Sequence, residues 1–245
     1  IIKNKYCIVM IFKKILRKII PDNIIFYLKK KTLFKKKFFG LNNIDQKLLQ
    51  YLDYNNGYFI ELGANDGVTQ SNTLHYEIYK NWNGILIEPI KSKFDQCKAI
   101  RKNSNKFFNC ACVSRNYKQE DIKLIYSNLR SITLDENNLI NPKNHINNED
   151  LNFFQKHNEF KVKVKSLNSI LEESKAPNLI DFFSLDTEGY EMEILKGVDF
   201  NQYNFKYLLI ESKKIEFLKS YLVPKNYSLI DQLSKQDYLF RFNDY

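Results

Sequence analysis

From residue 41 onward, short apolar runs alternate with longer segments whose apolar residues recur at helical spacing. The apolar runs cover residues 57–62, 84–89, 106–114, 179–185 and 205–212. The helical spacing covers residues 44–52, 71–82, 91–103, 166–174, 188–197 and 213–222. Strands that are apolar throughout are buried on both faces, and parallel strands need crossover helices between them. The alternation therefore predicts an α/β fold with a doubly wound, mostly parallel sheet. Residues 227–243 read as two final strands joined by a tight turn.

Residues 114–160 interrupt this alternation. "KLIYSN" (123–128) and "FKVKVKS" (160–166) could be strands, and between them lies the polar, Asn-rich stretch "DENNLINPKNHINNED". Long segments of this kind often form binding loops or lids. We therefore expect an insertion over one rim of the sheet that carries substrate contacts or forms a lid.

The excess positive charge is confined to the N-terminus. Residues 1–39 hold twelve Lys or Arg and one acid, Asp22, so the formal net charge of +10 leaves −1 for the rest of the chain. An enzyme that acts on nucleic acid usually carries a basic stripe around its site. The nearly neutral body therefore argues against nucleic acid as a partner.

The basic segment over residues 11–37 is amphipathic, with apolar residues at helical spacing between its lysines. Two interpretations stay open: contact with an anionic membrane or a partner, or a helical arm packed on the body. We expect residues 1–40 to form this arm and residues 41–245 to form the main domain, with the insertion at about residues 114–160. Residues 1–9 precede Met10 and are left out of the fold.

Two further features concern the location of the protein. No apolar run reaches the roughly 18 residues of a transmembrane helix. The four cysteines show no zinc-site spacing and fit free thiols in a reducing compartment. Cys110 and Cys112 share one face of a predicted strand. The expected location is the cytoplasm, with peripheral contact at the inner face of the membrane as an option.

The stretch "FIELGANDGVTQSNT" (residues 59–73) contains an apolar strand, a turn with Gly63 and Gly67, and a helix start, in that order. Nucleotide sites in doubly wound sheets have this order, because glycine permits close approach and the helix N-terminus offers free N–H groups. A dinucleotide fingerprint needs glycine where Asn65 stands, which weakens an NAD interpretation. Glu61, just before the turn, fits a ligand with a positive group better than a pyrophosphate.

The second apolar run, "GILIEP", ends in Glu88. An acidic residue at the end of the second strand can accept hydrogen bonds from both ribose hydroxyls of an adenosine. Together with the glycine turn, Glu88 favours an adenosine-containing cofactor. S-adenosylmethionine meets both requirements, because it has a ribose diol, a cationic amine and a sulfonium.

Three blocks, "FIELGANDGVTQSNT", "NWNGILIEP" and "DFFSLDTEGYEMEILKG" followed by "YLLIES", resemble the FkbM family of S-adenosylmethionine-dependent methyltransferases in order and spacing. The resemblance runs from about Tyr58 to Ser212. It implies a class I methyltransferase fold with an antiparallel last strand, and O-methylation, commonly of sugars in surface glycans or of natural products. The residues that match the family's cofactor motifs are Glu61, Gly63, Asn65, Asp66, Gly67 and Glu88. Glu61 departs from the family, in which Asp is commoner. Ser71 and Asn72, candidate caps of the following helix, complete the expected cofactor contacts.

Three carboxylates are predicted at the edge where the parallel strands end. Asp186 and Glu188 follow one strand, and Glu211 ends the next. Ligands bind at that edge of open parallel sheets, and converging carboxylates repel each other unless a cation, a sulfonium or a proton offsets their charge. We expect Asp186, Glu188 and Glu211 to be catalytic. Glu191 and Glu193 are expected only to favour the first turn of a helix.

Two mechanisms stay open for the deprotonation of an acceptor hydroxyl. In the first, Asp186 and Glu211 hold Mg²⁺ or Mn²⁺, which binds the hydroxyl. In the second, no metal takes part and Asp186, Glu188 or His75 is the base. His75 lies one turn into the helix after the glycine loop, where a structural role is at least as well favoured. His145 and His157 lie in or beside the insertion.

The leading hypothesis is an S-adenosylmethionine-dependent O-methyltransferase acting on a sugar hydroxyl of a surface glycan, such as a bacterial capsule or lipopolysaccharide, or of a nucleotide-sugar precursor. One alternative is a nucleotide-dependent oxidoreductase. Another is a non-catalytic, membrane-associated module that keeps the fold but not the reaction.

Overall fold

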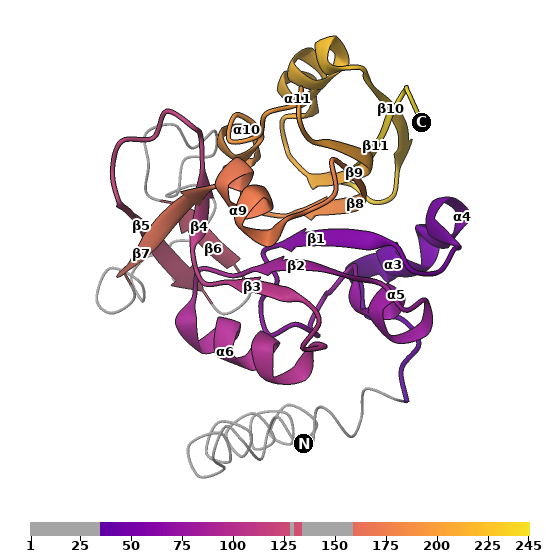
Figure 1. Cartoon of the computed structure of the whole chain (residues 1–245), viewed down its shortest axis with the longest axis horizontal. Coiled ribbons are helices and arrows are strands. Elements are labelled where there is room, and N and C mark those ends of the chain that lie inside the picture. Colours follow the sequence, from indigo (N-terminus) through magenta and orange to yellow (C-terminus); the bar gives the residue numbers. More distant parts are fainter. Residues whose placement is uncertain (1–34, 128–129, 134–158) are drawn as a thin grey trace, which may run out of the picture. The chain divides into compact units, whose positions relative to one another are not determined.

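The computed structural model describes residues 35–127, 130–133 and 159–245 (Figure 1). The chain divides into two units, Ile1–Lys37 and Phe38–Tyr245. The second unit contains the sheet and its helices and is described below.

Several expectations fall on residues outside this description. The basic segment over residues 11–37 lies outside the described residues except for its last three. His145 and His157 also lie outside them. Of the helices that are described, none combines the length and the apolar character needed to cross a membrane.

Within the described residues, a seven-stranded sheet has the order β10-β11-β9-β8-β1-β2-β3. Neighbouring strands from β3 to β9 are parallel, whereas β11 is antiparallel to both β9 and β10. The strands are Tyr58–Leu62 (β1), Asn83–Ile87 (β2), Lys106–Phe108 (β3), Leu179–Leu185 (β8), Asn204–Glu211 (β9), Tyr227–Gln232 (β10) and Asp237–Phe242 (β11). This confirms the predicted doubly wound sheet with an antiparallel last strand.

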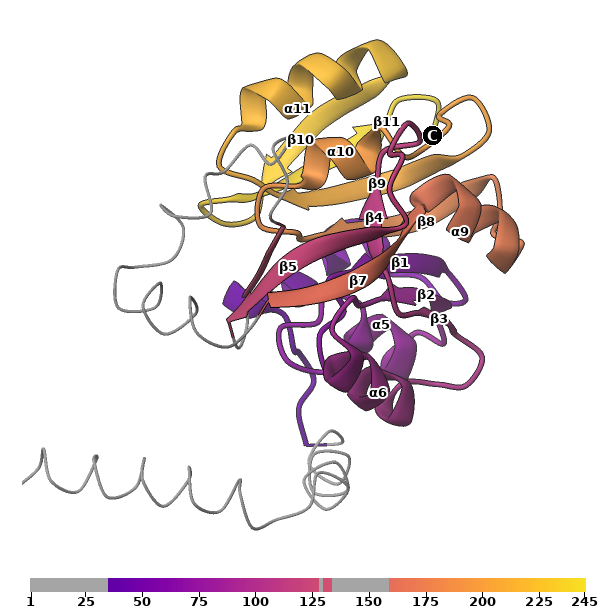
Figure 2. The ribbon, with the colours of Figure 1, turned by 90° about the vertical axis from the view of Figure 1, so that its left-hand side faces the viewer.

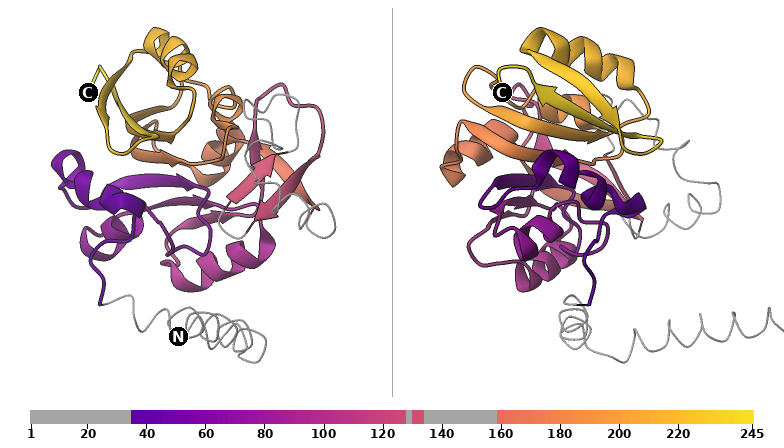
Figure 3. Two further views of the ribbon diagram at one scale, coloured as in Figure 1. Left: turned by 180° about the vertical axis from the view of Figure 1, so that it is seen from behind. Right: turned by 90° about the vertical axis from the view of Figure 1, so that its right-hand side faces the viewer.

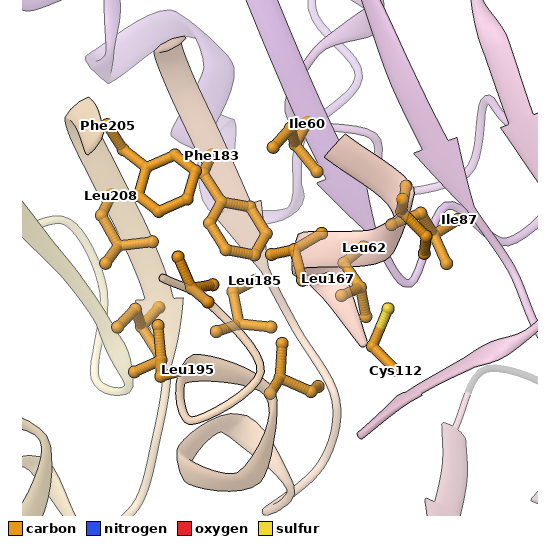
Figure 4. Close-up of a cluster of buried hydrophobic side chains, with 14 of the residues drawn as sticks. Ile60, Leu62, Ile87, Cys112, Leu167, Phe183, Leu185, Leu195, Phe205 and Leu208 are labelled. Atoms are coloured by element: carbon orange, nitrogen blue, oxygen red, sulfur yellow. The ribbon is translucent and has the colours of Figure 1, made fainter. Parts of the chain in front are cut away.

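Helices cover both faces of this sheet, as Figures 1 and 3 show. They are Ile44–Lys47 (α3), Leu49–Leu52 (α4), Leu74–Tyr79 (α5), Lys91–Ile100 (α6), Leu167–Ser174 (α9), Glu191–Leu195 (α10) and Ile215–Leu222 (α11), with short 3₁₀ turns at Leu41–Asn43 and Val223–Lys225. Because successive strand residues point to opposite faces, β1 contributes to two cores. Ile60 and Leu62 pack with α9, α10 and α11, and Phe59 packs with α3 to α6. Figure 4 shows the first of these cores.

A second, four-stranded sheet has the order β4-β7-β5-β6. It comprises Ala111–Val113 (β4), Asp121–Ser127 (β5), Arg130–Thr133 (β6) and Glu159–Ser166 (β7), and Figure 2 shows β4, β5 and β7 beside the ends of the main sheet. The two strands predicted at the flanks of the insertion are thereby confirmed. Ile122 and Leu124 of β5 are buried against the first core, so the insertion is anchored in the domain.

The structure corrects several predicted element boundaries. The single strand predicted over residues 106–114 is two strands, β3 and β4, which belong to different sheets. Asn109 lies between them and donates its side-chain N–H groups to the carbonyls of Glu88 and Pro89, over 2.8 and 2.9 Å. These bonds turn the chain away from the first sheet. The helix predicted over residues 71–82 is limited to α5, because Asn81 has a left-handed backbone (φ 56°).

Candidate active site

A cavity lies at the carboxyl ends of β1, β2 and β8, where sequence reasoning places the ligand. Gly63, Asn65, Glu88 and Asp186 are on its wall. The second sheet closes it with residues from Cys110 to Cys112 and with Leu124. The remaining lining residues are Glu61, Leu62, Ala64, Thr69, Gln70, Ser71, Pro89, Lys93, Thr187, Glu188, Tyr190 and Ile194.

The two glycines of the loop have different neighbours. Gly63 has φ +87°, and a Cβ there would lie 2.4 Å from the carbonyl oxygen of Asp186. This close approach brings the ends of β1 and β8 together under the cavity. Gly67 has φ +79°, and a Cβ there would meet Arg101 and Cys97 at 3.0 Å. The first glycine therefore serves the cavity, and the second makes room for α6 and the residue after it.

Asn65 and Asp66 shape the turn between these glycines. The Asn65 backbone is left-handed (φ 48°), and its N–H donates to Glu88 Oε2 over 2.8 Å. Its side-chain Oδ1 is buried at the cavity wall without a hydrogen-bond partner in the described part of the chain. Asp66 Oδ1 accepts from the N–H groups of Val68 and Thr69. Asp66 thus holds the loop in shape, whereas Asn65 presents an unused acceptor; contact of either with a cofactor stays a prediction.

Glu61 lies 4% exposed at the end of β1, with donors around its carboxylate. Oε1 accepts from Ser71 Oγ and the Asn72 N–H, over 2.9 and 2.8 Å. Oε2 accepts from Thr73 Oγ1 over 2.7 Å and from Arg101 Nη1 over 2.9 Å. The positive group that sequence reasoning expected beside Glu61 is therefore, in this structure, an arginine of the protein. A direct contact between Glu61 and a cofactor stays a prediction.

Ser71 and Asn72 join this loop to α5. Ser71 Oγ accepts from the Leu74 N–H over 3.1 Å, but the N-cap of α5 is Thr73, so neither Ser71 nor Asn72 occupies the predicted cap position. Asn72 Nδ2 donates to Ser184 Oγ of β8 over 3.1 Å. The Asn72 Oδ1 is buried without a partner among the residues that are described.

Glu88 is the carboxyl group of the second strand end. It is 6% exposed, and its two oxygens each accept one backbone N–H, from Asn65 and from Ile90, both over 2.8 Å. Burial raises the pKa of Glu88 to about 7, against the lowering effect of these two hydrogen bonds and of Lys93. Each oxygen keeps a further lone pair, so Glu88 can accept two more hydrogen bonds from a diol.

Asp186 and Glu211 meet across the ends of β8 and β9, where the two carboxyl groups lie close enough to interact. Desolvation, followed by the charges of Glu211, Glu188 and Glu191, raises the pKa of Asp186 well above its ordinary value. Asp186 also keeps contact with the solvent of the cavity. The negative charges of the neighbouring carboxylates raise the pKa of Asp186 whether or not water fills the cavity. The direction of the shift therefore rests on these charges. The predicted convergence of Asp186 and Glu211 is therefore present in the structure.

Glu191 has a larger part than sequence reasoning assigned to it. It does open α10, but its carboxylate is 2% exposed and accepts from the Gly189 N–H and from Thr187 Oγ1, over 2.8 and 3.2 Å. Burial raises the pKa of Glu191 to about 7. Glu193 instead pairs with Lys196 over 2.6 Å, which agrees with its expected role in the helix.

His75 is not among the residues of the cavity wall. Its ring is 1% exposed, stacked on Phe38 at 4.8 Å between centroids, and close to Tyr79 at 5.1 Å. The structure therefore gives no geometric support to His75 as the base. Trp82 is fully buried and donates to the Tyr54 carbonyl over 2.7 Å, so it is a packing residue.

The proposed metal ligands Asp186 and Glu211 stand as a pair. No group of three or more His, Cys, Asp or Glu side chains within the described ranges is arranged to hold a metal ion. Mg²⁺ and Mn²⁺ take about six oxygen ligands, so most of the ligands at this pair would be water or substrate oxygens.

Sequence reasoning missed Arg101, Glu77 and Lys93. Arg101 and Glu77 form a buried ion pair over 2.8 Å behind the glycine loop, and Lys93 lies on the cavity wall near Glu88. No local pattern marks Glu77 or Lys93, because each is an ordinary charged residue of a helix. A charged residue predicted on the buried side of α6 is the one signal that could have indicated Arg101.

Comparison with known proteins relates this site to one family. The family model described as "Methyltransferase FkbM domain" matches residues 61–241. Among solved structures, the chain is similar to a methyltransferase FkbM from Methylobacillus flagellatus KT, at 14% identity and a TM-score of 0.45, over 76% of this chain and 44% of that one. It therefore spans less than half the length of that protein. No curated protein matches.

Two further solved methyltransferases are similar in part. One is the METTL16 MTase domain, at 12% identity and a TM-score of 0.41, over 82% of this chain and 65% of that one. The other is precorrin-6y C5,15-methyltransferase from Geobacter metallireducens GS-15, at 9% identity and a TM-score of 0.37, over 81% and 85% of the two chains.

Proposed function

Because the chain belongs to the methyltransferase FkbM domain family, we propose that it is an S-adenosylmethionine-dependent O-methyltransferase that acts on a sugar hydroxyl. The family implies the methyl donor. The acceptor, a sugar of a surface glycan or of a nucleotide-sugar precursor, is our inference. The observation that carries it is Asp186, which has Glu211 as its neighbour and lies on the wall of the same cavity as an adenosine-compatible acid, Glu88.

The residues of the cavity fit an adenosine-containing methyl donor. Glu88 offers two free lone pairs to the ribose diol, and the buried Asn65 Oδ1 offers another acceptor. Gly63 leaves space where a side chain would collide with Asp186. When bound, S-adenosylmethionine supplies an electrophilic methyl group on a cationic sulfur.

We propose that Asp186 accepts the proton of the acceptor hydroxyl. The charge of Glu211 favours the protonated form of Asp186, and we propose that the two groups share a proton in the free protein. A cation in the cavity favours the charged form of a nearby carboxyl. Asp186 then loses its proton before the acceptor arrives and is available as the base. Glu188, also on the cavity wall, adds negative charge that strengthens the base.

A divalent cation is the alternative to this base. Asp186 and Glu211 would hold Mg²⁺ or Mn²⁺, and the cation would lower the pKa of the acceptor hydroxyl. We propose Asp186 as a base without a metal, because the described residues offer a divalent cation only the two carboxylates of Asp186 and Glu211. Chelation distinguishes the two.

The insertion is proposed to select the acceptor. Leu124 of β5 lies on the cavity wall, and the rest of the insertion follows that strand. Neutral apolar contact of this kind suits the carbon face of a sugar ring. The main competing function, a nucleotide-dependent oxidoreductase, would need close approach of a pyrophosphate to the loop, where Asn65 replaces glycine.

The basic segment over residues 11–37 is proposed to hold the enzyme at an anionic membrane surface, near glycan precursors. Its positive charge motivates this. In vesicle sedimentation, the full chain should bind anionic vesicles less strongly as salt rises. Replacement of Lys13, Lys14 and Lys18 by Gln should weaken that binding. If the full chain does not bind anionic vesicles at low salt, the packed-arm interpretation is the better one.

Calorimetric titration tests the cofactor assignment. S-adenosylhomocysteine should bind with a Kd of about 1–100 μM, in the range of small ligands buried in a pocket, and NAD should not bind. Tighter binding of NAD would favour the oxidoreductase. Binding of S-adenosylmethionine without transfer to any acceptor would favour the non-catalytic module.

A further inference from the structure

Arg101 directly follows α6, and its side chain is 0% exposed beneath the glycine loop. Its Nε donates to Glu77 Oε2 over 2.8 Å, and its Nη1 donates to Glu61 Oε2 over 2.9 Å. A buried arginine with two carboxylate partners is a rigid fork with fixed directions. One partner, Glu77, belongs to α5, and the other, Glu61, belongs to β1.

The same guanidinium also holds the loop itself. Nη1 lies 3.3 Å from the Gly67 carbonyl oxygen and 3.2 Å from Ser71 Oγ. Nη2 donates to Thr73 Oγ1 over 2.8 Å. Gly67 has no side chain at the point where Arg101 Cγ would be 3.0 Å from a Cβ. The second glycine of the loop is therefore explained by Arg101, by Cys97 of α6 and by its own left-handed backbone.

The loop thus has two sides with separate roles. On one side Asn65, Thr69, Gln70 and Ser71 form part of the cavity wall. On the other side the acceptors of the loop converge on Arg101, which is not part of that wall. Any motion of Arg101 would consequently move the wall without changing a direct ligand contact.

We propose that Arg101 is a positioning residue of the cofactor site: it holds the glycine loop in the binding-competent shape before the cofactor arrives, acting through Glu61, Ser71 and Thr73. The proposal rests on the proposed function. If the competent shape is populated a tenth of the time in a variant, the Kd rises about tenfold, because only the competent fraction binds.

The central test compares Arg101→Lys with Glu77→Gln, in the full chain. Lysine keeps the charge but cannot reach Glu61, Ser71 and Thr73 together. We expect the Kd for S-adenosylhomocysteine to rise about tenfold or more in Arg101→Lys. Glu77→Gln changes the one charged partner of Arg101 that lies outside the glycine loop, and it serves as the matched control. We expect it to lower the melting temperature while the Kd stays within about twofold of the wild type.

Amide hydrogen exchange in the free protein gives a second readout. A general loss of stability would not speed up exchange selectively at the glycine loop. The Asn72 N–H donates to Glu61 and the Leu74 N–H donates to Ser71. Both should exchange faster in Arg101→Lys and at the wild-type rate in Glu77→Gln. If Arg101→Lys does not fold, Thr73→Val, which removes one acceptor of the fork, takes its place with the same expectations.

A folded Arg101→Lys variant with wild-type exchange at Asn72 and Leu74 and wild-type affinity would overturn the positioning role. An equal loss of affinity in Glu77→Gln and Arg101→Lys would also overturn it, because the effect would then follow stability alone. Failure of the wild type to bind S-adenosylhomocysteine would instead count against the proposed function. Exchange is measured without a cofactor, so it decides the positioning role in that case too.

Discussion

The carboxyl groups of Asp186 and Glu211 lie side by side where the parallel strands β8 and β9 end. The charge of Glu211 favours a proton on Asp186, so we expect the two groups to share a proton and to titrate as a pair. A positive ligand beside them should displace that proton, since opposite charge favours the ionised form. Binding of the cationic cofactor and release of a proton are therefore expected to be coupled.

The first prediction is proton release on cofactor binding. Titration of S-adenosylmethionine in buffers of different ionisation enthalpy, near pH 7, should reveal release of up to about one proton per site. The neutral-sulfur product S-adenosylhomocysteine should release less. Asp186→Asn should abolish the difference between the two ligands, and Glu216→Gln, an exposed carboxylate paired with Lys219, should not. Equal release in wild type and Asp186→Asn contradicts the shared proton.

The second prediction concerns Glu88 and the ribose. Glu88→Gln replaces an ionised acceptor by a neutral amide. This substitution should weaken the binding of S-adenosylhomocysteine by roughly 1.5–3 kcal/mol, which is about ten- to a hundredfold in Kd. Because burial raises the pKa of Glu88 to about 7, the wild-type affinity should increase from pH 6 to pH 8 as the carboxylate forms. The affinity of Glu88→Gln should be flat over the same range. If the affinity of the wild type for S-adenosylhomocysteine did not change with pH, the assignment of Glu88 to the ribose would be contradicted.

The third prediction concerns stability. Burial raises the pKa of Glu191 from 4.5 in its ordinary state to about 7, so the folded protein binds more protons than the unfolded chain between these values. The free energy of unfolding of the cofactor-free protein should therefore decrease as pH rises through that window, by about 3 kcal/mol at most for this group. Denaturant titrations should show a shallower decrease for Glu191→Gln. An identical slope in both proteins would contradict the buried, proton-binding state of Glu191.

The fourth prediction concerns metal. With Asp186 as the base, methyl transfer should persist after thorough treatment with EDTA. Loss of activity that Mn²⁺ or Mg²⁺ restores would instead establish the alternative in which Asp186 and Glu211 hold a cation. In that case Glu211→Gln should weaken metal binding, measured by calorimetry, while S-adenosylhomocysteine still binds.

The outline of the fold and the location of the site were predictable because they depend on short-range patterns. Apolar runs separated by helical segments require parallel strands with crossovers, and the carboxyl ends of such strands meet at one edge. Asp186 and Glu211 could be paired from their positions after two neighbouring runs. Glu88 could be assigned to the second strand end in the same way, and the structure has it in the cavity with Asp186.

Other features depend on contacts between distant segments. Arg101 meets Glu61 across 40 residues of sequence, and no local pattern records that meeting. His75 could be placed on a helix but not on a face of it, since a shift of one residue turns a side chain by about 100°. Asn109 ends β3 through bonds to the carbonyls of Glu88 and Pro89, which a run of apolar letters does not reveal.

The most direct test of the account is transfer of an isotopically labelled methyl group from S-adenosylmethionine to a panel of nucleotide sugars and glycan fragments, followed by mass spectrometry of the products. The account predicts a methyl ether on a sugar hydroxyl, formed by the wild type with or without EDTA. It also predicts no product from Asp186→Asn, although that variant still binds S-adenosylhomocysteine. Methylation of an amine or a carbon atom, or unchanged turnover by Asp186→Asn, would contradict it.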